Sequence, residues 1–376
     1  MNAIPIAASP HIHAGTSVSR SMVLVMLALV PATIWGITQY GWPALNLLLV
    51  TMGAAIGAEA LSLRVAGRAA KPALADGSAL LTGWLLAITL PPWAPWWIGA
   101  IGAVFAIVIS KQLFGGLGQN LFNPAMVARV VLLIAFPLEM TTWVAPQPLL
   151  QPASPNITES LSITFLGASP ADAISGATAL AGRSHLATTT EGQHASMASG
   201  FEVREALLGL HHGSLGEGSS VLLAAGGLLL LLTGVIRWPI PMAMLGSLTL
   251  VASLFHFLDP GRYPHAELHL LSGGLILGAF FIATDPVTSP VTRTGQIIFG
   301  AGCGLLTYTI RTWGSYPEGV AFAVLLMNAA TPLIDYYIRP RIFGRTLSGV
   351  SLKLPEEQTA PAPKHRQARI AKSRPR

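Results

Sequence analysis

The stretch Gly83-Trp-Leu-Leu-Ala-Ile-Thr-Leu-Pro91 has a counterpart 195 residues later, Gly278-Ala-Phe-Phe-Ile-Ala-Thr-Asp-Pro286. Both are apolar runs that end in the pattern Thr-x-Pro. Proline lacks a backbone N–H and breaks a helix, so each stretch predicts a short helix that stops partway across a membrane. The dipeptides Trp42-Pro43 and Trp238-Pro239 repeat at nearly the same spacing. These matches favour a duplicated unit, although prolines that merely end helices at the membrane surface would give the same pattern.

The composition is that of a membrane protein. Of the 376 residues, 52% are hydrophobic and 10% are charged, whereas soluble domains carry about 25% charged residues. A helix of about 20 apolar residues crosses the hydrocarbon core of a membrane. We therefore expect an all-α polytopic membrane protein with about ten transmembrane helices. The expected spans are 21–40, 44–63, 77–92, 94–113, 124–143, 219–236, 241–258, 270–285, 296–312 and 319–338.

The distribution of Lys and Arg predicts the orientation. Nearly all basic residues outside the 144–218 segment fall on one side if both termini are cytoplasmic, as expected for a bacterial inner membrane. Arg311, near the outer end of the ninth span, is one exception. The 144–218 segment carries six acidic and two basic residues, as expected of a periplasmic loop. The remaining parts are a leader (1–20), a first half (21–143), a second half (219–338) and a basic tail (339–376).

Five spans in each half make the repeat an inverted one, because the second half then enters the membrane from the opposite face. Paired short segments interrupted by proline mark the binding site of such proteins. The sequence therefore predicts a 5+5 inverted repeat with a site at the two breaks. We also expect residues 201–210 to form an amphipathic helix on the outer surface.

Polar residues near the breaks are the candidate site residues. A charged group inside a span costs about 2.5–3.5 kcal/mol on insertion scales. Asp285 stands at the break of the eighth span, and broken helices expose groups that bind a cation or a ring nitrogen. An ion site or a second flavin site is expected from Thr89, Thr284, Asp285, Asn120 and Asn123.

Other polar residues have structural interpretations. Glu59, Arg129 and Asp335 are expected to pair with one another or with water near helix ends. The single cysteine, Cys303, cannot hold an iron–sulfur cluster, which needs about four thiolates. The sequence contains no HExxH motif, no phosphate-binding loop and no catalytic triad. We expect no metal site, no catalytic side chain and no nucleic-acid partner.

The expected periplasmic loop contains Asp172-Ala-Ile-Ser175-Gly176-Ala177-Thr178. By itself, Ser-Gly-Ala-Thr is a turn with a hydroxyl at its end. Gly176 supplies backbone freedom, and together with Ala177 it leaves the Thr178 hydroxyl open to a modifying enzyme.

Three further stretches resemble the RnfD (also called RsxD) family, which is related to NqrB. They are Lys111-Gln-Leu-Phe-Gly-Gly-Leu-Gly-Gln-Asn-Leu-Phe-Asn-Pro-Ala-Met126, Phe281-Ile-Ala-Thr-Asp-Pro-Val-Thr-Ser-Pro290 and Asn328-Ala-Ala-Thr-Pro-Leu-Ile-Asp-Tyr-Tyr337. The pattern D-x-x-S-G-A-T resembles the acceptor site of flavin transferases that join the FMN phosphate to a threonine hydroxyl. The resemblance covers residues 15–350.

The resemblance implies a ten-span inverted repeat within a six-subunit complex of the inner membrane. Such a complex passes electrons between ferredoxin and NAD and moves Na⁺ or H⁺. The modified threonine of the family maps onto Thr178, which would carry covalent FMN, and Asp172, Ser175, Gly176 and Ala177 map onto the recognition site of a periplasmic flavin transferase. A riboflavin is implied as a second cofactor, without assigned ligands.

The sequence leaves two alternative functions open. Inverted repeats with interrupted helices also serve secondary transporters and channels, and a fold does not decide function. A scaffold subunit without a cofactor is the other alternative. A flavin on Thr178 distinguishes the electron-transfer interpretation from both.

Overall fold

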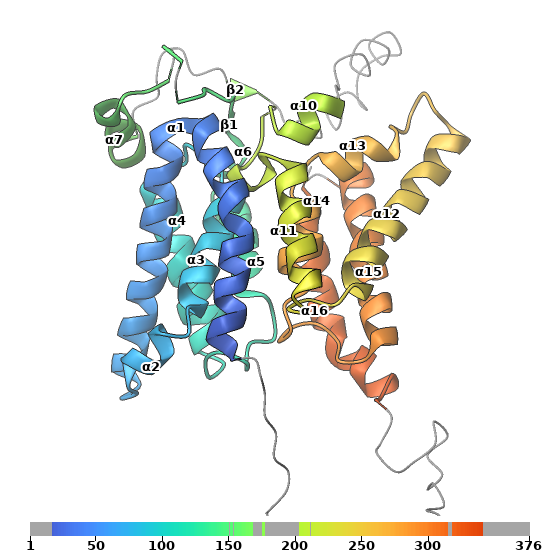
Figure 1. Cartoon of the computed structure of the whole chain (residues 1–376), viewed down its shortest axis with the longest axis horizontal. Coiled ribbons are helices and arrows are strands. Elements are labelled where there is room, and N and C mark those ends of the chain that lie inside the picture. The colour runs from blue at the N-terminus through green and yellow to red at the C-terminus, as the bar shows by residue number, and fades with distance from the viewer. Residues whose placement is uncertain are drawn as a thin grey trace, which may run out of the picture. The chain divides into compact units, whose positions relative to one another are not determined.

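The computed structural model describes residues 17–149, 151–152, 154–167, 175–176, 203–210, 212–314 and 318–340. The described part is largely helical, and its longer helices run side by side in a bundle (Figure 1). The predicted leader up to residue 16 and the basic tail beyond residue 340 lie outside the described residues.

Helix α1 (Val18–Val65) contains the first two predicted spans. Gly41 within it has φ 77° and ψ −164°, a conformation that glycine adopts without a steric penalty. The chain turns back at Gly41, so that α1 is a hairpin of two arms (Figure 1). The end of the bundle that carries this turn is called the Gly41 end below, and the end where α1 begins is called the Arg20 end.

The first half continues with five further helices. They are α2 (Ala70–Leu74), α3 (Ser78–Thr89), α4 (Trp96–Val104) with its π-helical continuation η1 (Phe105–Gln112), α5 (Pro124–Ala135) and α6 (Pro137–Thr141). The fifth predicted span, 124–143, is not one continuous helix, because it is interrupted at Phe136. Pro137 cannot donate to the helical ladder, so α5 stops at Ala135 and a short second helix follows.

The segment that connects the two halves of the chain, called the connecting segment, contributes short elements at the Gly41 end. They are β1 (Trp143–Val144), α7 (Ile157–Leu166), β2 (Ser175–Gly176), α10 (Val203–Leu208) and the 3₁₀ turn η3 (Leu215–Glu217). Strands β1 and β2 pair antiparallel, with Trp143 opposite Gly176 and Val144 opposite Ser175. Helix α10 confirms a helix within the predicted range 201–210.

The second half contains α11 (Ser220–Leu232), α12 (Pro239–Leu258), α13 (Ala266–Leu271), α14 (Leu275–Leu277), the π-helix η4 (Gly278–Ile282), α15 (Arg293–Trp313) and α16 (Val320–Tyr337). The eighth predicted span, 270–285, is not one helix. It consists of the end of α13, the single turn of α14 and η4.

Both predicted breaks are present. Helix α3 ends at Thr89, whose hydroxyl donates to the carbonyl of Leu86 at 2.7 Å. Thr284 follows η4, and its hydroxyl donates to the carbonyl of Phe280 at 2.6 Å. Each threonine thus satisfies a carbonyl near the helix end that its Thr-x-Pro pattern terminates.

Three described helices are long and apolar enough to cross a membrane by length and composition, namely α1, α12 and α16. Several shorter apolar helices lie at other predicted positions. The observed class is therefore a helical protein with several apolar helices, consistent with a polytopic membrane protein. Ten crossings related by an inverted 5+5 repeat stay a prediction.

Helices α12 and α15 pack closely because α15 has glycine at the contact. A Cβ atom at Gly304 would meet the backbone carbonyl oxygen of Met244 and the hydroxyl of Ser247. On α12, Gly246 has nothing within 4 Å of the position its Cβ would occupy. An added methyl group would therefore clash at Gly304 but not at Gly246.

We predict that Gly304→Ala lowers the thermal unfolding midpoint of the purified chain in detergent. The added methyl group forces α12 and α15 apart, at a cost of about 1–3 kcal/mol. The matched control Gly246→Ala should leave the midpoint unchanged or raise it slightly, because alanine favours a helix by up to about 1 kcal/mol over glycine. Equal midpoints for the two variants would contradict this packing.

Candidate functional site

A cavity of about 540 Å³ lies between the two halves of the bundle. The first half contributes the start of α1, one face of α3, and the segment that leads into α5. The second half contributes the end of α11 and the turn after η4. The polar side chains that line the cavity are Arg20, Ser21, Ser78, Thr82, Lys111, Asn120, Asn123, Thr233, Thr284 and Asp285.

The structure brings together four of the five residues predicted for an ion or second flavin site. Thr284, Asp285, Asn120 and Asn123 all line this cavity. Thr89 does not, and lines a separate cavity of about 20 Å³ instead. The single composite site expected from the two breaks is therefore divided between two cavities.

Asp285 is held by the turn that follows η4. One carboxylate oxygen accepts from the backbone N–H of Val287 at 3.1 Å, and the other accepts from the hydroxyl of Thr288 at 3.4 Å. Two carboxylate oxygens offer about four acceptor positions. The partly exposed carboxylate can therefore still bind a cation or a donor in the cavity.

Asn123 forms the opposite wall and starts α5. Its side-chain oxygen accepts from the backbone N–H groups of Ala125 and Met126 at 3.1 and 3.3 Å. Asparagine at this position and proline at the next are the residues that favour a helix start. Asn120 is fixed nearby, because its amide donates to the carbonyl of Phe122 at 3.2 Å.

Asn328 of α16 joins the two walls. Its side-chain oxygen accepts from the backbone N–H of Asn123 at 3.2 Å, and its amide nitrogen donates to the carbonyl of Thr288 at 3.1 Å. Thr331 donates to the same carbonyl at 3.0 Å. One buried amide thus connects the start of α5 with the turn that holds Asp285.

A buried ion pair borders the cavity at the Arg20 end. The Lys111 ammonium donates to Glu59 at 2.7 Å and to the hydroxyl of Ser78 at 2.6 Å. Gln112 donates to the same carboxylate oxygen of Glu59 at 2.8 Å. The prediction that Glu59 pairs with Arg129, Asp335 or water is wrong in its partner, because Lys111 approaches from η1.

Asp335 also has a different partner from the one expected. Its carboxylate accepts from the backbone N–H of Val291 at 3.2 Å. This bond ties the end of α16 to the segment that precedes α15.

The second cavity, nearer the Gly41 end, is bordered by charged side chains. Arg129 of α5 forms an ion pair with Glu318, which precedes α16. Glu217 also lines the cavity, and its carboxylate accepts from Ser214 at 2.8 Å. A volume of about 20 Å³ is sufficient for one water molecule.

Arg311, one exception to the charge pattern, is buried rather than placed on a surface. Its guanidinium donates to the carbonyls of His269 and Ser272 at 2.6 and 3.0 Å. These carbonyls lie at the end of α13, where helical partners are lacking.

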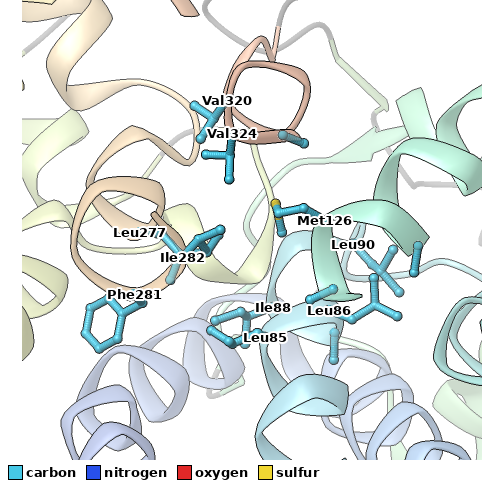
Figure 2. Close-up of a cluster of buried hydrophobic side chains, with 14 of the residues drawn as sticks. Leu85, Leu86, Ile88, Leu90, Met126, Leu277, Phe281, Ile282, Val320 and Val324 are labelled. Atoms are coloured by element: carbon cyan, nitrogen blue, oxygen red, sulfur yellow. The ribbon is translucent and has the colours of Figure 1, made fainter. Parts of the chain in front are cut away.

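Side chains of one apolar cluster line both cavities (Figure 2). Leu85 and Phe281 line the larger cavity, whereas Met126, Leu277 and Ile282 line the smaller one. Figure 2 shows these side chains gathered between α3, α5 and the helices that precede the second break. The cluster also includes Leu86, Ile88, Leu90, Val320 and Val324.

The structure describes only part of the motif Asp172–Thr178 in the connecting segment. Ser175 and Gly176 form β2, whereas Asp172, Ala177 and Thr178 lie outside the described residues. The partner strand β1 is buried, with Trp143 and Val144 exposed by 4% and 5%. Within the described ranges, no group of three or more His, Cys, Asp or Glu residues could hold a metal ion.

The chain matches one protein family and is similar to several known proteins that share one name. Residues 5–344 match the model of the NQR2, RnfD, RnfE family. The chain is 53% identical over 352 residues to the D subunit of the ion-translocating oxidoreductase complex of Halorhodospira halophila, covering 94% of this chain and 99% of that protein. The protein of the same name from Stutzerimonas stutzeri is 53% identical over 340 residues, which is 90% of this chain and 95% of that protein.

We predict that Asn328→Leu destabilises the bundle. The buried N–H of Asn123 then loses its acceptor, which costs about 1–3 kcal/mol, and the thermal unfolding midpoint in detergent falls. Thr309→Val is the control, because the Thr309 hydroxyl donates only to Leu305 of the same helix. Equal thermal unfolding midpoints for Asn328→Leu and Thr309→Val would show that the Asn328 amide does not hold the two walls of the larger cavity together.

Proposed function

The chain belongs to the NQR2, RnfD, RnfE family, and we infer that it is the membrane subunit of an Rnf-type ion-translocating electron transport complex. The observation that carries this inference is the 53% identity, over 94% of the chain, to the D subunit of an ion-translocating oxidoreductase complex. The match covers both halves and the segment between them, so it is not limited to one module. The chain acts within a redox-driven ion pump and is not an enzyme alone.

The proposed setting follows from the sequence-based orientation. Both termini lie in the cytoplasm, and the Gly41 end faces the periplasm of a bacterial inner membrane. The partners are the other subunits of a six-subunit complex and the surrounding lipid. Electrons pass between ferredoxin and NAD, and their flow drives Na⁺ or H⁺ across the membrane.

We propose that Thr178 carries FMN through a phosphodiester bond made by a periplasmic flavin transferase. The support is the motif Asp172–Thr178 and the β1–β2 pairing beside it. Ser175 and Gly176 are paired with a buried strand that directly follows the first half. Thr178 is two residues beyond Gly176 in the sequence. The flavin supplies the electron transfer, and the protein supplies its position and electrostatics.

The larger cavity suits a second, non-covalent flavin such as riboflavin. Its volume of about 540 Å³ lies within the usual range for ligand pockets, about 300–1,000 Å³. The side-chain oxygen of Asn123 is used in the helix cap, so Asn123 offers its NH₂ group to the polar edge of a flavin ring, and Asn120 offers its side-chain oxygen. On the opposite wall, Asp285 supplies a carboxylate for the coupling ion.

A channel or secondary transporter remains the alternative function. The two cavities are separate, and side chains of the apolar cluster in Figure 2 line both of them. The geometry therefore does not favour an open channel.

We predict that Thr178→Val abolishes covalent flavin, because valine has nearly the same shape as threonine but no hydroxyl. The chain is expressed with the transferase, and its fluorescent band is examined on a denaturing gel. Thr188→Val, in the same segment, should retain the fluorescence. Fluorescence that persists in Thr178→Val would exclude this attachment residue.

We further predict that Asp285→Asn uncouples ion movement from electron transfer, because the amide lacks the negative charge that binds a cation. Ion uptake per electron is measured in vesicles that contain the whole complex, and covalent flavin fluorescence should be unchanged. The control is Asp259→Asn, an exposed residue that follows α12. Coupling equal to the wild-type value would remove Asp285 from this role.

A further inference from the structure

Helix α7 exposes an apolar stripe. Ile157, Leu161 and Phe165 are spaced four residues apart and therefore lie on one face of the helix. Their exposed fractions are 58%, 45% and 45%. On the side that packs against the bundle, Ser160, Ile163 and Thr164 are buried. A helix on a water-soluble protein usually buries its apolar residues, whereas most apolar residues of α7 are exposed.

The orientation of α7 about its own axis is fixed. The hydroxyl of Ser160 accepts from the amide of Asn46 on α1 at 2.9 Å. The start of the helix is closed by a capping box, in which Glu159 accepts from the backbone N–H of Asn156 at 2.8 Å. Gly167 ends it with φ 69°. The stripe therefore cannot turn inward without loss of the Asn46 contact.

The stripe adjoins the apolar surface of the long helices. The Phe165 ring lies 6.3 Å from the ring of Trp96, which begins α4 and is 40% exposed. Leu49, less than one turn beyond Asn46 on α1, is 56% exposed, and Ile101 of α4 is 45% exposed. The apolar surface thus continues from α7 onto helices that face hydrocarbon in a membrane.

A third face of α7 is polar over its first turn. At 100° per residue, Thr158 and Glu159 follow the stripe around the helix, and both are exposed. Leu166 lies on the same face at the other end of the helix and is 82% exposed. Helix α7 therefore has one face for the bundle, one apolar face and one face that is polar at its start and apolar at its end. Trp96 stands at the same level, as aromatic residues do where a membrane meets water.

We propose that α7 lies in the lipid–water interface at the Gly41 end, with its apolar stripe among lipid acyl chains and Glu159 directed to water. Helices with an apolar face and a separate charged face bind membranes in this plane. The occupant is lipid, because the stripe is continuous with the lipid-facing surface of α1 and α4. Sequence patterns alone predicted a surface helix at 201–210, whereas the exposed apolar stripe lies on α7.

The proposal can be tested with single-cysteine probes in the full chain. Cys303 is the sole cysteine and is buried, so Cys303→Ser provides the background. A bimane fluorophore is attached at Leu161→Cys, at Ile157→Cys or, as the control, at Glu159→Cys. The labelled chains that remain monodisperse are placed in phosphatidylcholine vesicles with or without brominated acyl chains.

We expect the two stripe probes to lose more than half of their fluorescence in brominated lipid, and the Glu159 probe to lose little. The Glu159 probe should instead be quenched by aqueous iodide. Weak lipid quenching at both stripe positions, with strong iodide quenching, would place the stripe in water and overturn the proposal. Protection from both quenchers would show that protein covers the stripe, and would overturn it as well.

The same measurement in the assembled complex completes the test. Lipid quenching of the stripe probes that persists in the complex supports lipid as the occupant. Lipid quenching that disappears when the other subunits are present would assign the stripe to a protein partner and overturn the proposal.

Discussion

The structure depends on one constraint: irregular backbone at membrane depth must be surrounded by protein, because lipid cannot satisfy its polar groups. The sequence predicts that the breaks after Thr89 and Thr284 lie at membrane depth, where this constraint applies most strongly. Each threonine hydroxyl bonds to a carbonyl of the preceding turn. Polar side chains can gather around the breaks for the same reason. The cavities lie there because the helices stop there.

The two cavities differ in a way that fits ion-coupled electron transfer. The larger one combines amides of the first half with Asp285 of the second, and Asn328 holds the two walls together. The smaller one is bordered by the Arg129–Glu318 pair and has room for about one water molecule. Side chains of the apolar cluster in Figure 2 line both cavities.

The sequence predicted the features that depend on local chemistry. Proline after an apolar run located both breaks, and the pattern of apolar runs located helices in the expected segments. It failed where the decisive contact is distant. The Glu59–Lys111 pair joins positions 52 residues apart, which leaves no spacing to detect. The end of α5 was missed because the apolar residues after Pro137 extend the run. Thr89 was grouped with Asp285, although the two residues line different cavities.

The main functional proposal is that this protein carries its redox group on the connecting segment, at Thr178. The direct test is mass spectrometry of the peptide that contains residues 170–190, taken from the complex in its native membrane. We expect a mass increase equal to FMN less one water, and fragmentation that places it on Thr178. An unmodified peptide from a complex that still transfers electrons would contradict the proposal.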